Sequence, residues 1–134
     1  MQVYCSDEFL TALNKLTKPK FTNVYGSLTA EIAQFFKDYD TFDKVWNKSY
    51  VIRETQFIRI NKVRLENPLQ NSGTSGGFRL IVICDNRTQH IGLIYVYPKT
   101  GPHGTPNTPK DFLVKITKGY HQAKAAGKLK LYQP

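Results

Sequence analysis

Four basic side chains and one tyrosine between residues 62 and 99 have the types and spacing that phosphate chemistry requires. Lys62 and Arg64 are two residues apart in a predicted strand, so they point from the same face. Arg79 begins the next predicted strand, and antiparallel pairing would bring its side chain to the first two. Tyr97 and Lys99 lie at the end of a third predicted strand. We therefore expect a cationic patch on a rigid sheet, with a tyrosine at its rim.

Such a patch suits a phosphodiester, because arginines bind phosphate oxygens through two parallel hydrogen bonds and a tyrosine ring can stack on a base. The same residues also have a purely structural interpretation, since Lys and Arg often line the solvent-facing side of strands. Arg79 in particular could be paired with Glu66 or Asp85 across the sheet. The residue types alone leave both interpretations open.

Other kinds of site are not indicated. The sequence contains no P-loop, no GxGxxG run and no Cys/His spacing of a metal site. The three histidines, His90, His103 and His121, are scattered along the chain, and no paired carboxylates accompany the basic strands. We therefore expect any cleavage to depend on cationic side chains, with no metal and no cofactor.

The positive charge is concentrated in one part of the chain. The formal net charge is +9. Residues 1–55 carry seven basic and seven acidic side chains, whereas residues 56–134 carry twelve basic and only three acidic ones. A one-sided basic field attracts polyanions such as RNA, DNA, a ribosome or an acidic protein. A solubilising surface is the alternative, and the asymmetry favours a polyanionic partner.

The elements that must position these side chains follow from hydrophobic periodicity. Apolar residues at helical spacing predict two N-terminal helices, the first capped by Ser6, and a period of two then predicts three strands joined by short connections. Short connections favour antiparallel hairpins. The chain is therefore expected to be α+β, with N-terminal helices packed on a small twisted antiparallel sheet and a C-terminal helix. The expected segments are a short strand around Tyr4, helices after Ser6 and from about Leu28, strands at 57–65, 77–84 and 91–97, and a helix from Thr108-Pro109 to Gly127.

Length and composition indicate a single domain over residues 1–134. A hydrophobic share of 40% and an aromatic share of 13% exclude a disordered chain. No apolar run approaches the roughly 20 residues of a membrane helix, and the N-terminus lacks the pattern of a signal peptide. Cys5 and Cys84 are expected to be reduced core residues. These features predict a cytoplasmic protein with no membrane segment.

A resemblance to a known family rests on two runs, Asn61-Lys62-Val63-Arg64-Leu65 and Ser75-Gly76-Gly77-Phe78-Arg79-Leu80-Ile81-Val82. They resemble the centre of the RelE/ParE superfamily of type II toxins, whose members carry a basic strand of the form K-x-R-L, a turn, and then G-G-[FY]-R-[LV]-I. The apolar strand that ends at Tyr97-Pro98-Lys99 is similar to the last strand of that family. Residues 38–55 depart from the pattern and look like an insertion.

The resemblance implies a small α+β fold and one of two activities. RelE-like members bind in the ribosomal decoding site and cut mRNA, whereas ParE-like members inhibit DNA gyrase, and both are normally silenced by a co-expressed antitoxin. We expect the RelE-like activity, a metal-independent endoribonuclease that inhibits translation. The alternatives are a ParE-like gyrase inhibitor and a non-catalytic RNA-binding module.

On the RelE-like interpretation, a ribose 2′-hydroxyl attacks the adjacent phosphate, and this reaction needs a base, cations and an acid. Lys62 is the expected base if neighbouring cations lower its pKa, and Arg64 and Arg79 stabilise the developing charge. The candidates for the acid are Lys99, His103, Tyr120 and His121; the candidate RNA contacts are Tyr97, His103, Tyr120 and His121. The expected partners are a cognate antitoxin, the ribosome and mRNA.

Overall fold

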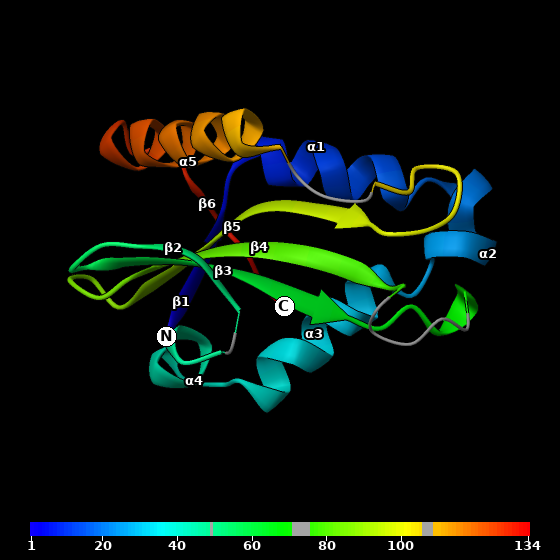
Figure 1. Cartoon of the computed structure of the whole chain (residues 1–134), viewed down its shortest axis with the longest axis horizontal. Helices are drawn as coiled ribbons and strands as arrows, with labels where there is room; N and C mark the ends of the chain where they lie inside the picture. The colour runs from blue at the N-terminus through cyan, green and yellow to red at the C-terminus, as the bar shows by residue number, and fades with distance from the viewer. Residues whose placement is uncertain (49, 71–75, 106–108) are drawn as a thin grey trace.

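The computed structural model describes residues 1–48, 50–70, 76–105 and 109–134. Within these residues a six-stranded sheet lies between helices on both of its faces (Figure 1). The elements in chain order are β1 (Gln2–Cys5), α1 (Asp7–Leu16), the 3-10 turn η1 (Pro19–Phe21), α2 (Thr22–Tyr25), α3 (Leu28–Asp38), α4 (Phe42–Trp46), β2 (Val51–Glu54), β3 (Ile58–Leu65), the 3-10 turn η2 (Pro68–Gln70), β4 (Phe78–Asp85), β5 (His90–Pro98), α5 (Lys110–Ala125) and β6 (Lys130–Leu131).

The α+β fold with N-terminal helices on a sheet and a C-terminal helix is confirmed, but the sheet is mixed and not wholly antiparallel. The strand order is β2-β3-β4-β5-β1-β6. Strands β3 to β5 pair antiparallel, as predicted, and β2, which the sequence did not predict, pairs antiparallel with β3. Strand β1 pairs parallel to β5 and antiparallel to β6. The prediction missed the parallel pair because β1 and β5 are far apart in the sequence, where no hairpin turn dictates direction.

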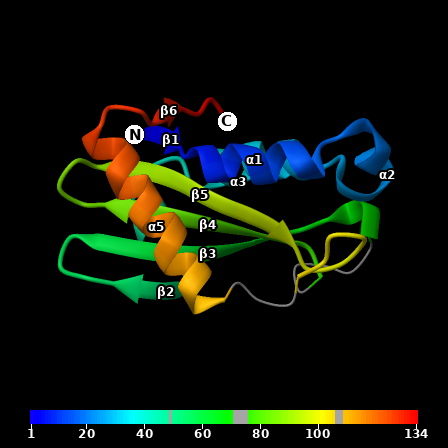
Figure 2. The ribbon, with the colours of Figure 1, turned by 90° about the horizontal axis from the view of Figure 1, so that it is seen from above.

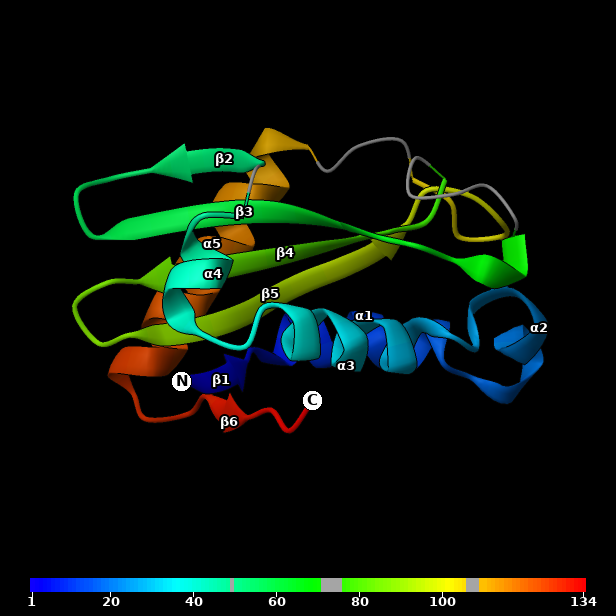
Figure 3. The same cartoon turned by 90° about the horizontal axis from the view of Figure 1, so that it is seen from below.

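One face of the sheet packs against the N-terminal helices. Alternate residues of the central strands, such as Val63 on β3 and Leu80 on β4, meet Phe9 of α1 and Ile32 of α3 in one buried cluster. Figure 3 shows α3 and α4 lying over this face. The period of two in the strands and the helical spacing of the apolar residues therefore build the main core.

The other face of the sheet is covered by α5. Ile116 and Tyr120 of this helix are buried against Ile81, Ile83 and Ile94 of the central strands. Figure 2 shows α5 crossing the strands obliquely over the half of the face that is nearer the β4–β5 turn. The other half of this face, at the C-terminal ends of β3 and β5, carries Lys62, Arg64 and Arg79.

The helix ends follow the predicted capping in part. The Ser6 hydroxyl accepts a hydrogen bond from the backbone N–H of Phe9 at 3.2 Å, as predicted. Helix α4 is separate from α3 and has its own cap at Thr41. Pro109, expected as the first helical residue, is instead the cap of α5, and Thr108 lies outside the described residues. Gly127 has a φ of +67° just after α5, which is the left-handed conformation that ends helices.

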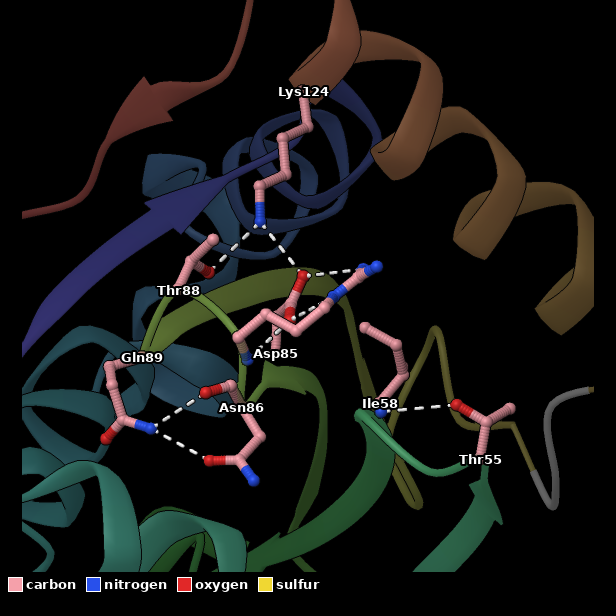
Figure 4. A network of polar contacts seen from close by, with 8 residues as sticks. Thr55, Ile58, Asp85, Asn86, Thr88, Gln89 and Lys124 are labelled. Atoms are coloured by element: carbon pink, nitrogen blue, oxygen red, sulfur yellow. Dashed lines mark hydrogen bonds and ion pairs between the residues drawn. The ribbon is translucent and has the colours of Figure 1, made fainter.

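A polar network fixes the C-terminal half of α5 to the β4–β5 turn (Figure 4). The buried carboxylate of Asp85 accepts hydrogen bonds from the Arg87 side chain at 3.2 Å and from Lys124 of α5 at 3.3 Å. Lys124 also lies 3.3 Å from the Thr88 hydroxyl. This network ties the C-terminal half of α5 to the sheet, in addition to the burial of Ile116 and Tyr120.

Both cysteines are buried free thiols, as expected. Burial raises the pKa of the Cys84 thiol to about 12, so this group is an inert part of the core. None of the helices in the described ranges is both long enough and apolar enough to cross a lipid bilayer.

Candidate phosphate-binding site

The structure brings together the four cations that the sequence singled out, on the face of the sheet that α5 covers in part. Arg64 of β3 is directly opposite Arg79 of β4, and Arg79 is directly opposite Tyr97 of β5. Lys62 pairs with Ile81, one step further along β3 on the same face. Lys99 follows the end of β5. We call Lys62, Arg64, Arg79 and Lys99 the cation cluster.

The members of the cation cluster are close enough to change one another's ionisation. Burial lowers the pKa of Lys62, and the charges of Arg79 and Arg64 lower it further. Burial followed by the charges of Arg79, Lys62 and Arg64 lowers the pKa of Lys99. The cluster therefore concentrates positive charge at one point of a rigid sheet, which favours the binding of an anion.

The four cations differ in their exposure to solvent. Arg64 is exposed, Lys62 and Lys99 are half-buried, and Arg79 is only 4% exposed. An arriving phosphate therefore meets Arg64, Lys62 and Lys99 first. Arg79 contributes its charge from beneath them.

Arg79 is buried, unlike the other three members of the cation cluster. Its Nη1 donates a hydrogen bond to the backbone carbonyl of Phe78 at 3.1 Å. The structural alternative of a pair with Asp85 is wrong, because Asp85 lies at the opposite end of β4 and binds Arg87 and Lys124. Arg79 is therefore positioned by the strand pairing on either side of it.

The start of β4 and the end of β5 are held together beside the cation cluster. The backbone N–H of Lys99 donates to the carbonyl of Gly77 at 2.9 Å. A side chain at Gly77 would collide with the backbone carbonyl of Leu65. The absence of a side chain at Gly77 thus allows β3 and β4 to approach closely.

Tyr97 lies beneath the surface and not at the rim where the sequence placed it. The residue is 2% exposed, and its hydroxyl is a buried group with no hydrogen-bond partner in the described part of the chain. It lines a hollow of about 300 Å³ between the β2–β3 edge and the start of α5. The hollow is also lined by Tyr50, Lys62, Lys110 and Leu113.

Tyr50 is a site residue that the sequence reasoning missed. Its ring lies 4.9 Å from Lys62 Nζ and 5.8 Å from the guanidinium carbon of Arg64, so it borders the cation cluster. Its carbonyl accepts a hydrogen bond from the Lys62 backbone N–H at 2.9 Å. The signal is present in residues 50–54, a tyrosine followed by the strand-like run Val-Ile-Arg-Glu, but the comparison with the family pattern places this stretch in an insertion.

His103 packs against the N-terminal helices and lines a small hollow together with Tyr97 and Pro98. Its ring packs on Phe21 at 4.8 Å between ring centroids, and its backbone N–H donates to the Tyr25 hydroxyl at 2.9 Å. Its pKa is lowered by burial and then by the charges of Lys15, Lys20 and Lys18, none of which belongs to the cluster.

Tyr120 and His121 lie on α5 at the other end of the sheet. Tyr120 is 1% exposed, and its ring packs directly on Gly92 in the core. His121 is exposed, and its nearest charged neighbours are Lys124, Asp85 and Arg87. Neither residue shares the cluster's end of the sheet, so the geometry leaves Lys99 as the acid candidate that lies within the cluster.

Comparisons with protein-family models, with curated proteins and with solved structures gave no match. Among the described residues, no three His, Cys, Asp or Glu side chains converge as ligands of a metal ion. The cation cluster and its surroundings are therefore the features of the protein that indicate a function.

Proposed function

We propose that this protein is the toxin of a type II toxin–antitoxin system, a RelE-like endoribonuclease that cuts mRNA on the ribosome in the cytoplasm. The observation that carries the proposal is the convergence of Lys62, Arg64, Arg79 and Lys99 on one face of a rigid sheet. The resemblance of residues 61–65 and 75–82 to that family supports it independently of the geometry.

Mutual repulsion in the cation cluster favours an anionic ligand. Cations that lower one another's pKa are held together at a cost in folding free energy. A phosphodiester that binds among them removes that repulsion. Arginine fits phosphate oxygens through its planar fork, and a half-buried lysine of lowered pKa releases its proton more readily than an ordinary lysine.

The proposed reaction is an intramolecular transesterification. Lys62 Nζ, in its neutral form, takes the proton of the ribose 2′-hydroxyl, and the 2′-oxygen forms a bond to the adjacent phosphorus. Arg64 and Arg79 stabilise the negative charge that develops on the phosphate oxygens. The bond from phosphorus to the 5′-oxygen breaks, and Lys99 donates a proton to that oxygen. The products are a 2′,3′-cyclic phosphate and a free 5′-hydroxyl.

Each proposed role agrees with the ionisation of its residue. A lowered pKa increases the neutral fraction of Lys62 at a given pH, which a base requires. The same effect makes Lys99 a stronger acid than an ordinary lysine. The proposed reaction requires neither a metal nor a cofactor. An antitoxin that covers the cation cluster would keep the protein inactive.

Expression of the protein without an antitoxin tests the proposal. We expect bacterial growth to stop and intact mRNA to disappear before DNA supercoiling changes. In vitro, ribosomes that carry a defined mRNA should yield fragments with cyclic phosphate and 5′-hydroxyl ends. Growth arrest with intact mRNA and reduced gyrase activity would replace the proposal with the ParE-like alternative. Binding of RNA without cleavage would support the second alternative, a non-catalytic RNA-binding module.

A further inference from the structure

The hollow beside the cation cluster has the chemistry of a nucleobase site. Tyr50, Tyr97 and Leu113 are among its lining residues, and the buried hydroxyl of Tyr97 has no hydrogen-bond partner among the described residues. Lys62 belongs both to the hollow and to the cation cluster. A nucleotide is complementary to these two adjacent sites, because its planar base has a polar edge and is joined to an anionic phosphate.

The hydroxyl of Tyr97 is the strongest of these observations. The side chain is almost completely buried, and a buried hydroxyl without a hydrogen bond is unfavourable. The hydroxyls of Tyr97 and Tyr120 are both buried without a partner among the described residues, and Tyr97 is a lining residue of the hollow of about 300 Å³ beside the cation cluster. A ligand atom that accepts or donates a hydrogen bond at this point would satisfy the Tyr97 hydroxyl.

Tyr50 supplies a stacking surface at the mouth of the same hollow. The residue is 47% exposed, and the hydrogen bond from the Lys62 backbone N–H to its carbonyl fixes its backbone to β3. Its contact with Lys62 Nζ at 4.9 Å places an aromatic face next to the phosphate-binding charges. Bases stack on such faces with little dependence on sequence.

We propose that this hollow binds one unpaired base of the RNA whose phosphate lies in the cation cluster. Tyr50 stacks on the base, the Tyr97 hydroxyl bonds to its polar edge, and Lys62 lies where base site and phosphate site meet. The proposal rests on the proposed function and adds a subsite to it. Tyr50 comes from the stretch of residues 38–55, so this subsite belongs to the segment that departs from the family pattern.

The test compares two probes that the enzyme cannot cut by the proposed route. One is a single-stranded RNA of ten mixed nucleotides with 2′-O-methyl groups, and the other is an oligomer of equal length made of abasic tetrahydrofuran units. Tyr50→Ala should weaken binding of the RNA about 5- to 150-fold and leave binding of the abasic oligomer unchanged. Tyr50→Phe, which keeps the ring, should restore the RNA affinity.

Tyr97→Phe removes only the hydroxyl. We expect RNA affinity to fall about two- to tenfold, while the melting temperature stays the same or rises because the buried hydroxyl has no partner to lose. Tyr120→Phe is the matched control, since it also removes a buried unpartnered hydroxyl but at the other end of the sheet. It should not change RNA affinity. Phe57→Ala, an exposed ring beside Arg87, is the matched control for Tyr50→Ala.

The outcomes separate the subsite from the proposed function. If Tyr50→Ala and Tyr97→Phe bind both probes as the wild type does, or weaken both probes equally, the base subsite is overturned. Arg64→Met should weaken both probes, because it removes a phosphate contact. If Arg64→Met binds both probes as tightly as the wild type, the phosphate site fails, and the proposed function fails with it.

Discussion

The lowered pKa of Lys62 depends on charges from two strands. Burial is the largest cause, followed by the charge of Arg79 from β4 and then that of Arg64 from β3. Lys99, near the end of β5, adds to the positive field that these cations share. A base must be neutral to accept a proton, so the proposed cleavage should speed up as the pH rises through the pKa of Lys62.

Arg79→Met tests this coupling directly. The loss of a charge-stabilising group should reduce the cleavage rate about 10²- to 10³-fold. Loss of one positive neighbour raises the pKa of Lys62, so the rising limb of the pH–rate profile should move to higher pH. The shift should be partial, because burial still lowers the pKa. The measurement is single-turnover cleavage of a defined mRNA across a pH series.

The control for this variant is Arg59→Met. Arg59 is also on β3, but it lies on the opposite face, over the Trp46 ring and paired with Glu54. We expect its pH–rate profile to match that of the wild type. A reduced rate in Arg79→Met with an unmoved profile would contradict the role of Lys62 as the base.

At the scale of elements, the buried carboxylate of Asp85 holds α5 to the sheet through its contact with Lys124. Burial alone would raise the pKa of Asp85, but hydrogen bonds from the side chain and backbone of Arg87 and from Lys124 outweigh it, and the pKa is lowered. The carboxylate therefore stabilises the fold at neutral pH, and this stabilisation disappears as the pH falls through the lowered pKa. When Asp85 is protonated at low pH, the fold therefore loses stability, and α5 loses the charged partner of Lys124.

Asp85→Asn should reduce the free energy of unfolding by about 1–2 kcal/mol at pH 7, because two cations lose their charged partner and one of them is half-exposed. The difference from the wild type should shrink as the pH approaches 2. Urea unfolding at several pH values measures it. Asp40→Asn breaks an exposed pair with Lys44 and should change stability little at any pH. A constant difference across the pH range would contradict the account.

The helix α5 contains a glycine whose replacement should stabilise the protein. Gly119 lies inside the helix, and the nearest atom to an added side chain is a carboxylate oxygen of Glu8 at 2.9 Å, which is the mobile end of a flexible side chain. Gly119→Ala should therefore raise the free energy of unfolding by about 0.5–1 kcal/mol. Thermal or urea unfolding measures the change.

Gly77→Ala gives the contrasting result. There the neighbouring atom is the backbone carbonyl of Leu65, which cannot move without displacing β3. We expect a loss of about 1–3 kcal/mol. Equal effects of the two substitutions would show that the close approach of β3 and β4 does not matter for stability.

At the scale of the whole molecule, the excess positive charge should make RNA binding depend strongly on salt. For single-stranded nucleic acid, each phosphate contact adds about 0.7 to the slope of log affinity against log salt concentration. Arg64→Met removes one exposed contact and should reduce that slope by about 0.7. Lys128→Met removes the same charge from an exposed position beyond α5, so its slope should equal that of the wild type. Equal slopes for all three proteins would argue against a localised phosphate site.

The sequence by itself determined the three central strands, β3 to β5, and the face that their basic residues share, but not β2 or β6. Successive strand residues point to opposite faces, so Lys62 and Arg64 had to lie together, and a short turn had to pair β4 with β5. Helices α1 and α3 could also be predicted, because apolar residues at helical spacing and the Ser6 cap are local signals. The cation cluster was predictable for the same reason.

Only the tertiary structure decided how deeply each side chain is buried and which residues surround it. Burial of Arg79, Tyr97 and Tyr120 depends on what covers each position, and the covering elements come from distant parts of the chain. The parallel pairing of β1 with β5 is likewise a contact across most of the sequence. Tyr50 reaches the cluster only because β2 adds to the edge of β3. Periodicity is a local property of the chain and can be recognised in one segment. Packing depends on contacts between segments, and the number of residues between two segments does not determine how close they lie in space.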